Sequence, residues 1–226
     1  MAKRSSSTIP HKCQVLCEPS PASVRLTRMR VTFAIAFLAA LTSASWANAQ
    51  TISSQYSSTA PRNCRRIGKP SELDGSTTRL CPGKAGLSVL ISEDDLRETV
   101  SVGRNRAAAA KEPAAQVWFE PFNSSLTTVE WRMAGSRPFA IIQRWLIADN
   151  ADRDEKDRPR DKAMLAVTRL PPGAVCHVAY IDVTANPNAN ELARKAADEL
   201  ARDFQCSWDE VKIIGASGRA VELAKR

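Results

Sequence analysis

The sequence predicts an α+β protein, with an antiparallel β-sheet of about six to eight strands and one long C-terminal helix packed on it. Two patterns favour this class. Apolar and polar residues alternate before and after the acidic turn at 93–95, as in a β-hairpin. One extended amphipathic pattern, over residues 188–204, lies near the C-terminus. Short polar turns between the predicted strands favour antiparallel neighbours.

The strands are predicted from alternation and from short apolar runs. Residues 139–147 are nearly all apolar, which indicates a central strand with both faces partly covered. The turn at 171–173 separates two further strands because it contains two prolines and a glycine. The predicted strands are 77–81, 87–92, 99–102, 127–133, 139–147, 163–170, 174–183 and 211–214.

The predicted helix has both a start and an apolar stripe. Asn186 offers an N-cap, and the proline that follows it suits a first helical turn. Leu192, Ala196, Leu200 and Phe204 recur every four residues and therefore share one face. We expect this face to pack on the sheet.

The first 49 residues have the pattern of a secretory signal peptide. Two arginines precede an apolar run at 31–41, which is too short to span a bilayer, and the Ala47-Asn48-Ala49 sequence fits a cleavage site before Gln50. Residues 1–28 form an unusual polar extension. We expect translation to start at Met29, with a long basic region at the start of the signal peptide as the alternative.

The remaining chain is predicted to be a flexible tail at 50–63 followed by a single exported α+β domain at 64–226. Residues 50–63 are rich in Ser and Thr and contain Pro61. Removal of the leader leaves no stable membrane anchor, so we expect a periplasmic or secreted protein.

The charge of the predicted mature chain argues against a nucleic-acid partner. Residues 50–226 contain 26 basic and 23 acidic residues, whereas residues 1–49 contain six basic residues and one acidic residue. A net charge of +3 with both signs interspersed gives little attraction for a polyanion.

Four cysteines remain after the predicted cleavage, an even number that indicates disulfides in an exported protein. Four cysteines allow three pairings. We predict Cys64–Cys81 and Cys176–Cys206, because each pair is close in sequence and lies within one structural block. No Cys-x-x-Cys motif suggests redox exchange, and no histidine lies at the spacing of a zinc ligand among these dispersed cysteines.

No motif identifies a reaction. Any catalytic triad in residues 50–226 would have to use His177, which strand alternation places on one face with Val175, Ala179 and Ile181. Phosphate-binding and dinucleotide-binding glycine patterns are missing, so no cofactor is predicted. A carboxylate-dependent hydrolase of the cell envelope is an alternative, with acidic candidates but no distinguished pair. These candidates are Glu93, Asp94, Asp95, Glu98, Glu120 and Glu130.

A second alternative is a calcium-binding module through the loop 149–161. Oxygen-bearing side chains recur at loop positions typical of an EF-hand when counting starts at Asn150. Glu155 stands where that loop needs glycine, and Asp161 stands where it needs glutamate. Five basic residues in or beside the loop also offset its acidic charge.

An aromatic cluster is the strongest candidate for a binding surface. Trp118, Phe119 and Phe122 lie together beside Pro121 and would form either a plug at one end of the sheet or an exposed binding patch. The leading hypothesis is therefore a non-catalytic, disulfide-stabilised exported module that binds a protein, an envelope component or a small ligand.

Overall fold

The computed structural model describes residues 50–68 and 76–225, all of which belong to one compact unit, residues 47–226. The predicted signal peptide and the two alternative start positions lie outside the described residues. Among the residues described, no helix is long and apolar enough to cross a membrane.

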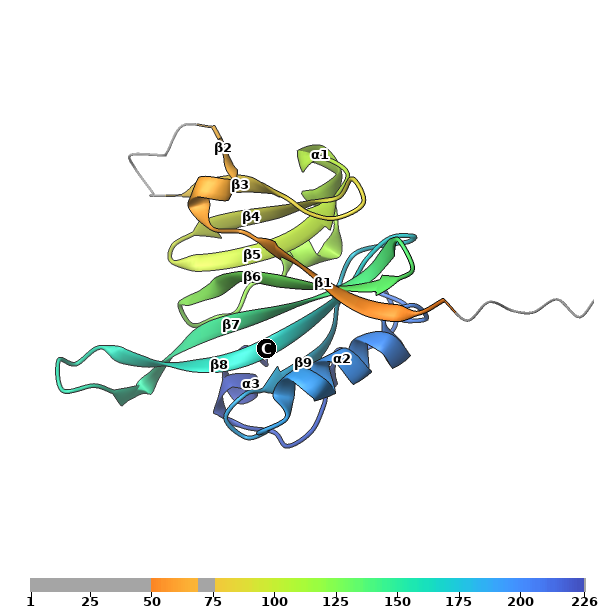
Figure 1. Cartoon of the computed structure of the whole chain (residues 1–226). Coiled ribbons are helices and arrows are strands. Elements are labelled where there is room, and N and C mark those ends of the chain that lie inside the picture. The colour runs from red at the N-terminus through yellow and green to blue at the C-terminus, as the bar shows by residue number, and fades with distance from the viewer. Residues whose placement is uncertain (1–49, 69–75, 226) are drawn as a thin grey trace, which may run out of the picture. The chain divides into compact units, whose positions relative to one another are not determined.

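The centre of the fold is a ten-stranded sheet (Figure 1). The strand order is β10-β9-β8-β7-β6-β5-β4-β3-β2, and β1 pairs with β6 beside this path. Its strands are β1 (Ile52–Ser58), β2 (Arg65–Ile67), β3 (Thr77–Pro82), β4 (Ser88–Asp94), β5 (Arg97–Gly103), β6 (Asn123–Ala134), β7 (Arg137–Arg153), β8 (Pro159–Arg169), β9 (His177–Asp182) and β10 (Lys212–Ile213).

The predicted fold class is wrong in both of its parts. The sheet has more strands than predicted and is mixed, because β5 pairs with β6 and β9 pairs with β10 in parallel. The described helices are short: α1 (Arg106–Ala109), α2 (Ala189–Leu200) and α3 (Arg219–Ala224), with 3₁₀ turns η1 (Pro61–Asn63) and η2 (Pro113–Gln116). The parallel pairs were not predicted because they are very short. The β5–β6 pair is a single bridge and the β9–β10 pair spans two residues, which is too short to give a recognisable pattern in the sequence.

Helix α2 is shorter than the predicted 188–204 because tertiary contacts end it early. The guanidinium of Arg169 donates a hydrogen bond to the backbone oxygen of Phe204 at 2.9 Å, and Cys206 is bonded to Cys176. The predicted stripe does face the sheet, since Ala196 and Phe204 are buried and Leu192 and Leu200 pack against the same core.

Residues 52–58 are not part of a flexible tail. They form β1, which pairs antiparallel with β6 from Ser58 opposite Thr128 to Ile52 opposite Ala134. Polar contacts reinforce the pair, because the indole nitrogen of Trp131 donates to the hydroxyl of Ser57 at 2.8 Å. A strand held by serine side chains has no apolar alternation, which is why the sequence pattern missed it.

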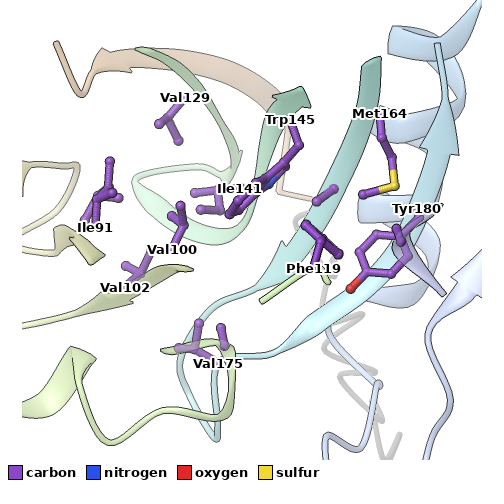
Figure 2. Close-up of a cluster of buried hydrophobic side chains, with 14 of the residues drawn as sticks. Ile91, Val100, Val102, Phe119, Val129, Ile141, Trp145, Met164, Val175 and Tyr180 are labelled. Carbon is purple, nitrogen blue, oxygen red and sulfur yellow. The ribbon is translucent and has the colours of Figure 1, made fainter. Parts of the chain in front are cut away.

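The sheet has a hydrophobic core on each face. Strand β7 contributes Ile141, Trp145 and Ile147 to the larger core (Figure 2), and Ala140 and Ile142 to the core beneath α2. The prediction of a central strand with both faces partly covered at 139–147 is confirmed, since β7 lies between β6 and β8 and contributes to both cores.

Both predicted disulfides are confirmed. Cys64 and Cys81 join the segment after η1 to β3, with Cα atoms 4.2 Å apart. Cys176 and Cys206 join the residue before β9 to the segment that follows α2, with Cα atoms 5.8 Å apart. The second bond closes a segment of 30 residues that contains all of α2.

Candidate functional site

The aromatic cluster divides between core and surface. Phe119 is 1% exposed, and its ring packs edge-on against Trp145 at 5.1 Å and Tyr180 at 5.6 Å between ring centroids. Phe119 is therefore a core residue and does not belong to the exposed binding patch that was one of the two alternatives for this cluster. Trp118 and Phe122 are each 42% exposed. Neighbouring residues of an extended segment point to opposite sides, which sends Trp118 outward and Phe119 inward.

The two exposed rings are held in place by one arginine. The guanidinium carbon of Arg97 lies 5.6 Å from the ring centroid of Trp118 and 5.0 Å from that of Phe122. The same side chain donates to the backbone oxygen of Glu120 at 2.7 Å. Cation–π contacts on both rings, together with this hydrogen bond, restrict their motion.

Leu96 extends this surface and was missed by the sequence analysis. It lies in the tight turn between β4 and β5, is 58% exposed, and has φ +59°, while Asp95 before it has φ +47°. Such turns favour Asn or Gly, because a bulky side chain is strained at positive φ. The signal in the sequence was a leucine in an otherwise polar turn. Leu96, Trp118 and Phe122 are called the turn patch below.

Acidic side chains surround the turn patch. A cleft of about 300 Å³ on one side is lined by Leu96 and Phe122 together with Glu93. A second cleft, of about 360 Å³, is lined by Trp118 together with Asp94 and Asp95. The one basic residue between the rings, Arg97, is already paired with Asp95. The rim is therefore negatively charged.

Two of the carboxylates proposed for a hydrolase, Glu98 and Glu130, are occupied by partners within the fold. Glu98 lies opposite Glu93 in the β4–β5 register, but both of its oxygens are occupied. Arg79 donates to one oxygen at 2.6 Å, and the amide and hydroxyl of Ser125 donate to the other at 2.7 and 2.6 Å. Glu98 thus ties β3, β5 and β6 together. Glu130 is likewise paired, with Arg194 at 2.7 Å.

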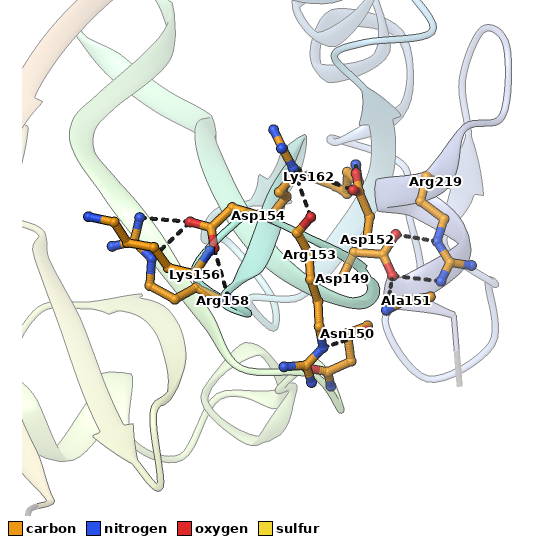
Figure 3. A network of polar contacts seen from close by, with 11 residues as sticks. Asp149, Asn150, Ala151, Asp152, Arg153, Asp154, Lys156, Arg158, Lys162 and Arg219 are labelled. Carbon is orange, nitrogen blue, oxygen red and sulfur yellow. Dashed lines mark hydrogen bonds and ion pairs between the residues drawn. The ribbon is translucent and has the colours of Figure 1, made fainter.

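The acidic residues of 149–161 lie along the β7–β8 hairpin and do not converge (Figure 3). Asp149 accepts two hydrogen bonds from Arg219 on α3, at 2.7 and 2.8 Å. These bonds lower the pKa of Asp149 to about 2, against the opposing effect of its burial. Asp152 is paired with Lys162.

Asp154 is also occupied within the hairpin. It accepts hydrogen bonds from the side chain of Arg158 at 2.8 Å and from the backbone amides of Lys156 and Arg158 at 2.9 Å. The Arg158 bonds are the main cause of its lowered pKa. In the described part of the chain no group of three acidic, histidine or cysteine side chains is placed to hold a metal ion. The geometry gives the calcium alternative no support.

His177 is a core residue. Its ring is 3% exposed, lies 2.7 Å through Nδ1 from the hydroxyl oxygen of Tyr180, and stacks on Phe119 at 6.2 Å between centroids. The predicted alternation with Ala179 and Ile181 is wrong. A register irregularity between Thr168 and Val167 on β8 shifts His177 to the face of Tyr180.

The burial of His177 predicts acid sensitivity. Burial lowers its pKa from 6.5 to about 4. Between these values the unfolded chain binds a proton that the folded chain does not, so stability falls as the pH falls. The expected loss between pH 7 and pH 4 is about 3 kcal/mol. Urea unfolding at a series of pH values would measure it.

The His177→Gln variant is the control for this titration. It keeps a neutral polar side chain but has no group that titrates in this range, so its stability should change less between pH 7 and pH 4. Asp149 does not interfere, because the stability that its lowered pKa contributes is present throughout this window and is lost mainly below its usual pKa of 3.8. An unchanged pH dependence in the variant would contradict the assignment.

A second concave surface lies beside the first half of α2. It is a groove of about 490 Å³ on the face of the sheet that α2 covers only in part. The groove leaves no pattern in the sequence, because its walls come from five elements and a β-bulge. Its lining residues are Tyr56, Ser125, Leu126, Thr127, Thr128, Glu130, Ile142, Arg144, Leu165, Asn190 and Arg194.

Comparison of this chain with protein-family models, with curated proteins and with solved structures finds no match.

Proposed function

We propose that the chain is a non-catalytic exported module, periplasmic or secreted, that binds a partner protein through the turn patch. The observation that carries this proposal is Leu96, an exposed leucine at φ +59°. Asparagine or glycine would adopt this backbone at lower cost. Strained residues persist at binding and catalytic sites where the side chain itself is needed.

The two aromatic rings suit the centre of a protein interface. Trp is enriched among the residues that dominate binding free energy, especially where its surroundings hold it in place. Arg97 fixes Trp118 and Phe122 before any partner binds. Fewer side-chain rotamers are then lost on association, which lowers the entropic cost.

The acidic rim indicates the charge of the partner. Asp94 is exposed beside Trp118, and Glu120 is exposed and lies between the two aromatic residues in the sequence. A partner segment with an apolar side chain flanked by Lys or Arg would match this surface. Export is supported by the two disulfides, since such bonds persist in oxidising compartments.

The Leu96→Asn variant tests this proposal because it separates binding from stability. Asn accepts positive φ more readily, so the variant should be more stable than the parent by about 1 kcal/mol. It should nevertheless lose the partner. Affinity capture from envelope extract, followed by mass spectrometry, would compare the parent, Leu96→Asn and Trp118→Ser.

Trp208→Ser is the matched control, because Trp208 is 86% exposed and lies outside the turn patch. We expect the parent and this control to capture the same partner protein. Both patch variants should capture at least about tenfold less of it. The same captured proteins in all four samples would contradict the proposal.

A further inference from the structure

The groove beside α2 has an apolar floor and a wall that is fixed in place. Ile142 and Leu165 form the floor, and Leu126, which is 40% exposed, stands at the wall. The register of β6 with β7 shifts between Ser125 and Val129, so the intervening residues bulge out of the ladder.

Two hydrogen bonds hold this bulge. The side-chain amide of Gln143, itself 2% exposed, donates to the backbone oxygen of Leu126 at 3.0 Å. The backbone amide of Thr59 donates to the backbone oxygen of Thr127 at 2.7 Å. The wall is therefore formed without a ligand, and its shape does not depend on an induced change.

The charges around the groove leave one cation uncompensated. Glu130 pairs with Arg194 through bonds of 2.7 and 3.3 Å, and Arg132 pairs with Asp198 at 2.7 Å. These two acidic and two basic groups cancel. Arg144 is half-buried in the groove, and within residues 50–68 and 76–225 its guanidinium makes no hydrogen bond or ion pair.

We propose that the groove binds a small organic monocarboxylate with an apolar tail. The carboxylate pairs with Arg144, whose planar guanidinium matches it with two parallel hydrogen bonds. The tail lies on Leu126, Ile142 and Leu165. A ligand with one negative charge neutralises the single uncompensated cation, and a groove of about 490 Å³ has the size of a small-molecule site.

This site is separate from the turn patch, and its test does not depend on the partner protein. Decanoate is the probe, with decanol, decyltrimethylammonium and decyl phosphate as the neutral, cationic and dianionic comparisons. Binding to the full chain would be measured by isothermal titration and by shifts of amide signals in NMR spectra, below the concentration at which each probe forms micelles.

Decanoate should bind at or below about 1 mM and at least about tenfold more tightly than any of the three comparisons. The shifted amides should be those of residues 126–130, 142–144 and 190–194. Arg144→Met, which keeps an unbranched apolar side chain, should weaken decanoate binding at least about tenfold, and Arg144→Lys should weaken it less.

Arg158→Met is the control, because Arg158 is an exposed arginine of the β7–β8 hairpin outside the groove. It should bind decanoate as the parent does, and so should the Leu96→Asn variant. Thermal unfolding of each variant confirms that it is folded. Any of four results would overturn the proposal. These are no decanoate binding, equal affinity for decanol and decanoate, tighter binding of decyl phosphate than of decanoate, and unchanged decanoate affinity in Arg144→Met.

Discussion

Replacement of Phe119 by alanine should lower the free energy of unfolding by roughly 3–5 kcal/mol. The ring is 1% exposed and contacts both Trp145 and Tyr180. Its removal leaves a cavity between β7 and β9 that these large neighbours cannot fill by a small shift. Urea unfolding monitored by circular dichroism would measure the loss.

Trp118→Ala and Phe122→Ala provide the comparison for this prediction. Both rings are 42% exposed, and each loses one cation–π contact with Arg97, so each change should cost about 1 kcal/mol or less. A Phe119→Ala variant no less stable than these two would show that Phe119 is not part of the core.

Replacement of Cys176 and Cys206 together by serine should cost about 3–4 kcal/mol, as the chain-entropy model gives for a closed segment of this length. The closed segment spans 30 residues and includes all of α2. The reduced chain can separate α2 from β9, whereas the native chain cannot. The measurement is urea unfolding, with non-reducing peptide mapping of the parent to verify the bond.

A reducing agent supplies the control for the cysteine variant. Reductant should lower the stability of the parent by at least as much as the double substitution does. Reductant should lower the stability of the variant only by the contribution of Cys64–Cys81, which is the disulfide that the variant retains. Equal stability of the parent and the variant in the absence of reductant would contradict a structural role for this bond.

The features that were predicted correctly are those encoded by residues close in sequence. The disulfide pairs followed from cysteines that are 17 and 30 residues apart. The buried strand at 139–147 was visible as an apolar run, and the helix stripe as a four-residue repeat. Each of these patterns is complete within one segment, so a single sequence contains the whole signal.

The features that were missed depend on contacts between distant segments. The branch made by β1 needs Ser57 to meet Trp131, and the end of α2 needs Arg169 to reach Phe204. An irregularity in strand pairing, which alternation cannot reveal, places His177 on the opposite face from Ala179 and Ile181. The groove likewise depends on a β-bulge in β6. It also contains Arg144, and only the three-dimensional structure shows that this side chain has no acidic partner among the described residues.

The place of β1 has a consequence for how the N-terminus of the folded chain can be processed. Ser54 and Glu130, which contact each other across the β1–β6 pair, are 76 residues apart, so β1 forms only after β6 exists. Loss of residues 50–58 would leave the 128–134 segment of β6 with unpaired backbone donors and acceptors. An exposed row of this kind accepts a strand from another chain. Trimming the nine residues 50–58 beyond the predicted cleavage position would thus convert a closed edge into a site for strand exchange between molecules.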